Sequence, residues 1–402
     1  MNKISLVSLW EKLLADSTTY LIANMIYAIS LLGSSIYLTQ NISLGNFGKQ
    51  AFLYSIISLL TQITMFGQGG YNLLFGKEKG EQRVLSETFL PILIIFTLSS
   101  LVFFIHQYIF LEITEFEFFL ILITLLSNSL SLVIYPLIIS LKKNKLLILL
   151  KLVQSISLII SVYLIINKAN SDWHPYSRII SIMISSFIII LITVCVSKKS
   201  FKYPRIYEVV KRIKFGLKLV PHIILGTLLI TGDKYYIQYR FGEEDLGIYN
   251  LAFQLSAPIL FLGTAINQSY VTNLLGVDNT KNLVNKYITP LVVVILSVFY
   301  QLLIFSLFTL KLFSEKYNAS FKIFIVLSFA TLVQSLYMNE SSKLLSSSNP
   351  LKQSLISFLV FVLILILILT VKFSSIYTFS YSIVLIWFLM YSFTRWVNFY
   401  AR

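Results

Sequence analysis

Long apolar runs alternate with short polar segments along the whole chain, and "LISFLVFVLILILILT" is one of the clearest runs. A helix needs about 20 mostly apolar residues to cross the roughly 30 Å hydrocarbon layer of a membrane. Twelve segments have about this length, so the pattern predicts twelve transmembrane helices. Their approximate ranges are 17–39, 50–71, 86–106, 116–138, 146–166, 177–197, 219–240, 247–272, 287–310, 320–340, 353–371 and 377–397.

The composition leads to the same class of protein. Of the 402 residues, 57% are hydrophobic and 12% are charged, whereas soluble domains carry about 25% charged residues. No soluble shape could cover so much apolar surface, so most of the surface must face lipid. We therefore expect an all-α polytopic membrane protein.

The formal charge of +15 has two explanations, nucleic-acid binding or an excess of basic residues in cytoplasmic loops. With the N-terminus placed in the cytoplasm, the predicted topology assigns 23 of the 32 Lys and Arg residues to the inside and nine to the outside. This bias follows the positive-inside rule. It predicts that both termini are cytoplasmic, and we expect no nucleic-acid partner.

The most basic inside segment, 198–218, holds eight Lys and Arg residues and divides the predicted spans six and six. It could be an amphipathic helix on the inner leaflet or a solvated connector that enforces topology. The expected organisation is an N-terminal six-helix bundle (1–197), this connector, and a C-terminal six-helix bundle (219–402). Apolar residues at helical spacing in the connector are Ile206, Val209, Val210, Ile213 and Leu217.

The two halves show traces of an internal repeat. A shift of 199 residues places Tyr37 on Tyr236 and Gly48 on Gly247. In both places a span ends in aromatic residues, a polar segment follows, and a bulky residue with Gly opens the next span. Paired six-helix repeats with the substrate site between them are a recurring transporter plan. We expect the two bundles to form a V-shaped transporter.

Motifs for enzymatic chemistry are missing from the sequence. The three histidines share no metal-ligand spacing with each other or with other ligand residues, and there is no phosphate loop or nucleophile elbow. Cys195 is the only cysteine, which excludes an internal disulfide. We therefore expect a non-enzyme with no cofactor and no metal site.

Charged residues within spans are the candidates for function, because each costs about 2.5–3.5 kcal/mol on insertion scales and usually faces a partner or a cavity. Asp233 lies roughly 21 Å along the seventh span from its inner end, too deep to reach water, so we expect it to face a polar lumen. It shares a helical stripe with His222. Lys234 points about 100° away, and it either serves transport or extends outward to the interface.

Three further basic residues lie nearer the ends of spans. Arg240 is at the outer boundary, where an interfacial anchor is expected, and Arg178 is near the outer end of the sixth span, also in an interfacial position. Lys151 either extends to the cytoplasm, which we favour, or marks a basic mouth of the lumen. The candidate translocation residues are Asp233, Lys234, His222, Arg240, Lys151 and Arg178.

Two stretches carry a family resemblance. "GDKYYIQYRFGEEDLGIYNLAFQL" (232–255) and "LGNFGKQAFLYSIISLLTQITMFGQGGY" (44–71) resemble segments of the O-antigen flippases, the Wzx family. These belong to the polysaccharide branch of the multidrug/oligosaccharidyl-lipid/polysaccharide exporter superfamily. Asp233 and Lys234 match the charged pair of that family.

The resemblance implies a flippase of the bacterial cytoplasmic (inner) membrane. Its substrate would be an undecaprenyl-pyrophosphate-linked oligosaccharide, moved from the inner to the outer leaflet, with a cationic lumen and coupling to H⁺ or Na⁺. A polysaccharide polymerase and a chain-length regulator are the implied partners, besides membrane lipids. The basic residues within spans are sparse here, which departs from a strongly cationic lumen and gives more weight to a cation route through Asp233.

Two alternatives remain open at this point. One is a cation-coupled drug exporter of the same superfamily. The other belongs to a different class, a membrane-embedded glycan polymerase or glycosyltransferase. Such enzymes usually need a large outside loop, whereas the predicted outside loops reach only about ten residues.

Overall fold

The computed structural model of the chain describes residues 6–76, 81–110, 113–196, 203–274, 282–346 and 350–400. Helices account for nearly all of these residues, and no β-strand occurs within these ranges. The first half contains α1 (Leu6–Asn41), α2 (Leu44–Met65), α3 (Gln68–Phe75), α4 (Glu81–Phe110), α5 (Glu115–Ser140), α6 (Asn144–Lys168), the 3₁₀ helix η1 (Ser171–Tyr176) and α7 (Ser177–Val196). The second half contains α8 (Ile206–Phe241), α9 (Glu243–Leu274), α10 (Asn282–Thr309), the 3₁₀ helix η4 (Glu315–Tyr317), α11 (Asn318–Ser346), α12 (Pro350–Thr370) and α13 (Ile376–Tyr400).

The predicted multipass fold is confirmed. Each predicted span lies on one helix, except the second, which runs through α2 and α3. In the described ranges, ten helices are long and apolar enough to cross a membrane, and the α2–α3 pair, bent by 48°, makes an eleventh. α10 contributes a shorter apolar stretch, Val293–Thr309. Large apolar side chains such as Leu101, Phe119 and Leu369 are more than half exposed, as a lipid-facing surface requires.

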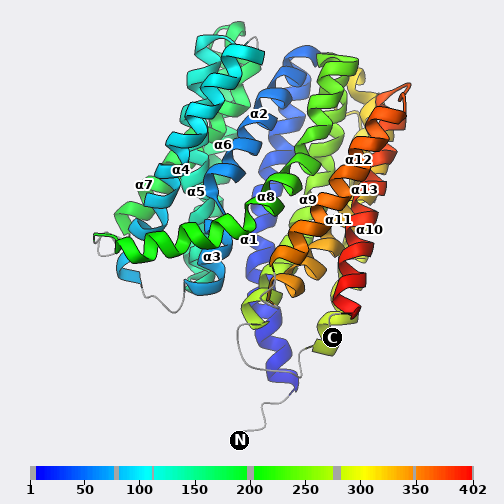
Figure 1. The fold of residues 1–402 in the computed structure, drawn as a ribbon. Coiled ribbons are helices and arrows are strands. Elements are labelled where there is room, and N and C mark those ends of the chain that lie inside the picture. Colours follow the sequence, from blue (N-terminus) through cyan, green and yellow to red (C-terminus); the bar gives the residue numbers. More distant parts are fainter. Residues whose placement is uncertain are drawn as a thin grey trace, which may run out of the picture.

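The helices form two groups. Figure 1 shows α2–α7 on one side of the molecule and α9–α13 on the other, with α1 between them, where it packs against both α6 and α9. α1 begins and α13 ends at the same end of the bundle (Figure 1), as an even number of crossings requires. That this end is cytoplasmic stays a prediction from the loop charges.

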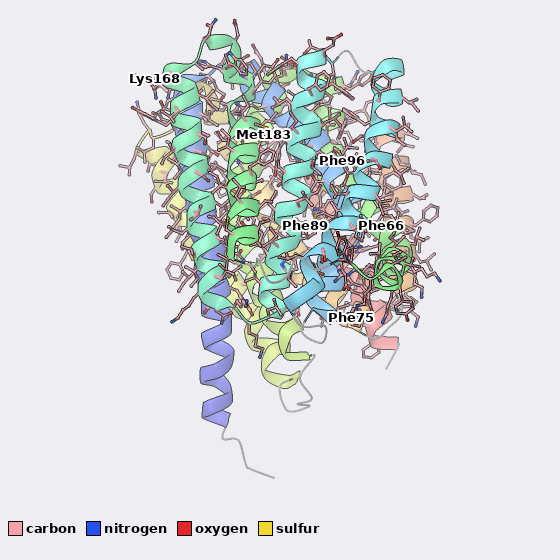
Figure 2. The ribbon with its side chains drawn as sticks, turned by 90° about the vertical axis from the view of Figure 1, so that its left-hand side faces the viewer. Phe66, Phe75, Phe89, Phe96, Lys168 and Met183 are labelled. Carbon is pink, nitrogen blue, oxygen red and sulfur yellow. The ribbon has the colours of Figure 1, made fainter. Side chains whose placement is uncertain are left out.

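The break between α2 and α3 depends on two left-handed residues. Phe66 (φ 48°) ends α2, and Gly67 (φ 71°) precedes α3. Only glycine adopts such a conformation at little cost, which explains Gly67 at this position. Figure 2 shows Phe66 and Phe75, at the two ends of this bent stretch, beside the first part of α8, where Phe215 packs against Phe75 with ring centroids 6.0 Å apart.

The predicted connector differs from the observed structure. From Ile206 onward it is the first part of α8, a single 36-residue helix that continues through Pro221 into the seventh span; residues 197–202 lie outside the described ranges. Figure 1 shows α8 lying across the end of the first group and then turning to run with the second. A proline within a helix removes one hydrogen bond and favours such a bend without ending the helix.

This first part of α8, residues 206–219, has two apolar sides. Val209 and Leu219 are buried, and Arg212 beside them is fully buried. A neighbouring side of the helix exposes Ile206 and Leu217 by 78% and 58%, as expected for a helix at a leaflet surface. The segment therefore combines the apolar free side of the amphipathic-helix alternative with a docked side that the sequence did not indicate.

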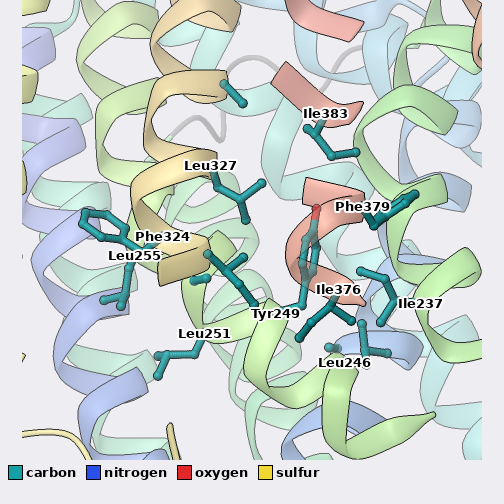
Figure 3. Packing of buried hydrophobic residues seen from close by; sticks show 14 of the residues in the cluster. Ile237, Leu246, Tyr249, Leu251, Leu255, Phe324, Leu327, Ile376, Phe379 and Ile383 are labelled. Carbon is teal, nitrogen blue, oxygen red and sulfur yellow. The ribbon is translucent and has the colours of Figure 1, made fainter. Parts of the chain in front are cut away.

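The largest apolar core links the two halves at one end. Leu38 and Phe47 of the first half belong to the same buried cluster as Tyr249, Leu251 and Tyr317 of the second. Figure 3 shows the part of this core around Tyr249, where α9, α11 and α13 meet. Three separate clusters lie in the first half. The halves are thus firmly joined at the end where α1 ends and α2 and α9 begin.

Candidate functional site

Asp233 and Lys234 form a buried ion pair. Their exposed fractions are 6% and 4%, and the Lys234 Nζ lies 3.2 Å from the Asp233 Oδ1. Tyr249 of α9 donates its hydroxyl to the Asp233 Oδ2 at 2.5 Å, and the Lys234 Nζ lies 3.6 Å from the ring centroid of Phe253. The carboxylate is therefore compensated, and the structure differs from the expectation of an Asp233 that faces a lumen. The long lysine stem folds back over its neighbour, although the two Cβ atoms point in different directions.

His222 does not join this pair. Its Nδ1 lies 2.8 Å from the Ser357 hydroxyl of α12, whereas Asp233 contacts α9 and lies eleven residues further along α8, roughly 16 Å away. The shared helical stripe therefore brings these two residues to different neighbours. Arg240 is exposed near the end of α8, in agreement with an interfacial anchor.

Arg178 is buried between the two halves, with 6% of its surface exposed. Its Nη1 donates to the Gln254 Oε1 of α9 at 2.5 Å and to the Ser35 hydroxyl of α1 at 3.3 Å. Ser35 also donates to the Gln254 Oε1 at 2.5 Å. The expectation of an interfacial Arg178 is wrong, because its side chain turns inward from the start of α7 and crosses to the second half.

Lys151 also lies inside the bundle and is half-buried. Its Nζ is 3.9 Å from the ring centroid of Tyr135, 4.6 Å from that of Tyr27, and 3.3 Å from the Gln154 Oε1. Tyr135 donates its hydroxyl to the same Gln154 oxygen at 2.7 Å. Two aromatic faces and an amide oxygen thus hold the ammonium group, so extension to the cytoplasm, which the sequence favoured, is not observed.

Tyr27 connects these two cations. It packs against Lys151 and lies in the neighbourhood of Arg178. On its other side it contacts Phe261 of α9, with ring centroids 6.0 Å apart. We call Arg178, Lys151 and Tyr27, together with Ser35 and Gln254, the cationic site. Hydropathy and spacing do not single out the three neutral members, because a Tyr, Ser or Gln within a span usually has only a structural role.

The buried carboxylates and the cations of the cationic site differ in whether they have an ion-pair partner. The buried carboxylates among the described side chains are Glu87, Glu117 and Asp233, and each has an ion-pair partner, Arg205, Lys49 and Lys234 respectively. By contrast, no carboxylate in the described ranges lies within ion-pair distance of Arg178 or Lys151. A buried cation without a counter-ion is costly. The cationic site therefore carries net positive charge that an anion would compensate.

The halves are closed against each other at the outer end of the predicted topology. A Cβ on Gly48 would lie 1.8 Å from the Glu243 carbonyl oxygen, and one on Gly247 would lie 2.4 Å from the Leu44 carbonyl oxygen. α2 and α9 therefore meet backbone to backbone. The two glycines that the repeat aligns face each other, which is the arrangement that a two-fold relation between the halves predicts.

Further contacts across this closed end come from the ends of helices. The Lys316 Nζ donates to the Ile42 carbonyl at 2.6 Å, and the Gln40 side chain donates to the Leu312 carbonyl at 2.9 Å. Phe47 packs edge-on against Tyr317, with ring centroids 5.6 Å apart. Together with the glycine pair, these contacts join the halves from α1 and α2 to η4.

Several solved structures that this chain is similar to are transporters. The chain is similar to a mutant of the Vibrio cholerae MATE transporter VcmN (TM-score 0.65, 14% identity, 97% of each chain covered). It is also similar to the MATE transporter ClbM in complex with Rb⁺ (TM-score 0.62, 14% identity, 96% and 94% covered). A third is an outward-facing multidrug resistance MATE family transporter of the MOP superfamily (TM-score 0.62, 13% identity, 96% and 94% covered). The chain is thus a multipass membrane protein with the MATE fold.

The sequence itself identifies the family. Residues 13–271 match the sequence model described as "Polysaccharide biosynthesis protein". The match spans more than half of the chain, and the chain therefore belongs to the polysaccharide biosynthesis protein family. No curated protein sequence matches it at a significant level.

Proposed function

We propose that this protein is a flippase of the bacterial cytoplasmic membrane. It moves a polyprenyl-pyrophosphate-linked oligosaccharide, such as an O-antigen repeat unit, from the inner to the outer leaflet by alternating access. The family and the fold support an exporter. The observation that carries the choice of substrate is the cationic site, where Arg178 and Lys151 lie between the halves without a carboxylate partner among the described residues.

The chemistry of this substrate matches the site. A pyrophosphate with several sugars cannot cross hydrocarbon unaided, because its charges and hydroxyls would lose their hydration. A guanidinium binds phosphate oxygens through paired hydrogen bonds, and an ammonium adds a point charge. The phenol of Tyr27 and the amide of Gln254 can hydrogen-bond to sugar hydroxyls. Transport of this kind needs two conformations and no bond-breaking step, so we propose a non-enzyme.

Coupling to H⁺ or Na⁺ belongs to the same proposal. In this structure the Asp233 carboxylate is compensated by Lys234 and Tyr249. A cation could bind there only if Lys234 moved away, so the pair would act as a switch rather than as an open ion site. The proposed protein partners are a polysaccharide polymerase and a chain-length regulator, which would receive the unit at the outer leaflet.

The proposal is tested first in cells. Deletion of the gene should abolish surface glycan and leave lipid-linked units on the inner leaflet. Unchanged surface glycan in a strain that lacks a second flippase would refute the proposed function.

A second test uses the purified protein in vesicles that contain a labelled polyprenyl-diphospho-oligosaccharide. We expect transfer of label between leaflets, and at least a tenfold slower transfer by Arg178→Gln and by Lys151→Gln. The matched control is Arg240→Gln, which removes an exposed guanidinium at the end of α8 and should transfer at the original rate. Equal transfer rates for all three variants would show that the cationic site is not needed for transport.

The drug-exporter alternative remains testable because MATE transporters share the fold. The substrates of drug exporters are commonly organic cations, which the uncompensated charge of Arg178 and Lys151 would repel. Efflux of a toxic organic cation by cells that express this protein would favour the alternative. The polymerase alternative predicts growth of glycan chains by the purified protein, which a flippase does not catalyse.

A further inference from the structure

An apolar cavity of about 340 Å³ lies between α1 of the first half and α9 and α10 of the second. It is partly open to the surroundings, and its lining is almost entirely apolar. Its volume is at the lower end of the range of about 300–1,000 Å³ that is typical of small-molecule sites. Residues that define its walls are Ala28 and Leu32 of α1, Phe261 and Leu262 of α9, and Phe299 and Leu303 of α10.

The cavity adjoins the cationic site. Ala28 follows Tyr27, and Phe261 lines the cavity while its ring contacts Tyr27. On the α10 side, Tyr300 also lines the cavity and donates its hydroxyl to the Leu255 carbonyl at 2.8 Å, next to Gln254, which holds Arg178. One contact between aromatic rings therefore separates an apolar space from two uncompensated cations.

The depth of the cavity places it away from the closed end. Its α1 residues, 21–32, precede the end of that helix at Asn41 by roughly 14–30 Å, at 1.5 Å per residue. Its α9 residues, 258–262, follow the start of that helix at Glu243 by roughly 22–29 Å. Its α10 residues, 296–303, precede the end of that helix at Thr309 by roughly 9–20 Å. The cavity thus lies around the middle of the bundle and extends into the half that the loop charges assign to the inner leaflet.

We infer that this cavity binds the first isoprene units of a polyprenyl diphosphate while the diphosphate occupies the cationic site. This inference rests on the proposed function and names the part of the substrate that the apolar space takes. Because lipid is itself apolar, an isoprene chain that enters the cavity from the bilayer gains packing contacts rather than removal from water, and the limited volume leaves the rest of the tail in lipid. A diphosphate carries more negative charge than a single phosphodiester, so the positive charge of the cationic site favours it over a phospholipid.

The test uses the full-length protein in nanodiscs and a photoreactive farnesyl diphosphate whose reactive group replaces the terminal isoprene. After illumination, peptide mapping should find adducts on the cavity-lining parts of α1, α9 and α10. Undecaprenyl diphosphate should compete for labelling at concentrations at least tenfold lower than phosphatidylglycerol. Equal competition by phosphatidylglycerol would identify an ordinary lipid crevice and overturn the inference.

Two variants make the test specific. Ala28→Phe fills the cavity and should reduce labelling at least tenfold, with inorganic pyrophosphate still bound at the original affinity. The matched control is Ile22→Phe, which adds similar bulk to a 45% exposed position of the same helix outside the cavity. Thermal unfolding of both variants in detergent checks that they fold.

The outcomes distinguish the cavity from the proposed function. If Ala28→Phe leaves the labelling unchanged while Arg178→Gln abolishes it, the cavity is not the site of the tail, but the proposed substrate still stands. If the folded protein shows no saturable binding of any polyprenyl diphosphate, the proposed function fails with it. Loss in Ala28→Phe with retention in Ile22→Phe supports the cavity as the site of the tail.

Discussion

The contact between Gly48 and Gly247 leads to a quantitative prediction about alternating access. A Cβ on Gly48 would lie 1.8 Å from the Glu243 carbonyl oxygen, about 1.6 Å short of the 3.4 Å at which ordinary contact begins. The Cβ is fixed directly to the backbone of α2 and the carbonyl oxygen belongs to the backbone of α9, so no flexible side chain can move aside. Gly48→Ala must separate α2 from α9. Overpacking of this kind costs about 1–3 kcal/mol.

The cost applies only to the conformation in which this end is closed. If the protein alternates between two states, Gly48→Ala should therefore shift the equilibrium toward the state with a separated outer end by roughly 5- to 150-fold. Gly247→Ala should act in the same direction. The double variant should show less than the sum of the two shifts, because one separation relieves both overlaps.

Pulsed electron spin resonance measures this shift. In a background with Cys195→Ser, spin labels at Asn41→Cys and Leu310→Cys report the distance across the closed end, where both positions are exposed. We expect a larger population of long distances in Gly48→Ala. The matched control is Gly226→Ala, where a Cβ meets nothing within 4 Å and the gain in helix propensity is the same.

A wild-type distance distribution in Gly48→Ala would refute the reasoning. So would an equal shift in Gly226→Ala, because the effect would then come from helix propensity. A lower unfolding temperature with an unchanged distribution would mean that the glycine contact contributes to stability alone and that the outer end does not open.

Three other predictions concern buried charges. Asp233→Asn or Lys234→Met alone should destabilise the protein by about 3–5 kcal/mol, since each leaves a buried charge uncompensated; the double variant should recover most of this loss in thermal unfolding. Arg212→Ala removes a 2.8 Å hydrogen bond to Asn72 and should increase hydrogen exchange in residues 206–219 selectively. Tyr135→Leu removes the nearest aromatic face from the Lys151 ammonium and should weaken folding by about 0.5–2 kcal/mol.

Each of these predictions has a result that would contradict it. If the double Asp233/Lys234 variant is as unstable as the single variants, the two charges do not mainly compensate each other. Uniform exchange along α8 in Arg212→Ala would mean that this guanidinium does not hold the first part of the helix. Unchanged stability in Tyr135→Leu would mean that Gln154, and not the ring of Tyr135, stabilises the Lys151 ammonium.

The positions and order of the apolar helices followed from the sequence because lipid imposes a simple rule. Every backbone group in hydrocarbon must be hydrogen-bonded within its own segment, so apolar runs of sufficient length become helices. The repeat was informative for a related reason. Gly48 and Gly247 are small where two backbones meet, and this requirement is local enough to survive in a weak alignment.

The positions of charged side chains could not be predicted in the same way. Arg178 lies near the end of its span in sequence, but the direction of its side chain depends on the packing of α1 and α9, which hydropathy does not describe. Asp233 and Lys234 are adjacent, and adjacent helical residues do not normally face each other. The continuity of α8 was missed because the change from a basic segment to an apolar run suggested a boundary at residues 218–219, whereas the helix continues through Pro221.

The continuity of α8 determines where this protein can be cut and recombined. A chimera joined at the predicted boundary between residues 218 and 219 would divide a single helix near Pro221. A junction before Ile206 keeps the helix whole, but Arg212 then needs the Asn72 of a foreign first half. Substrate specificity should therefore transfer between relatives only when α8 and its contact residues in the first half are exchanged together.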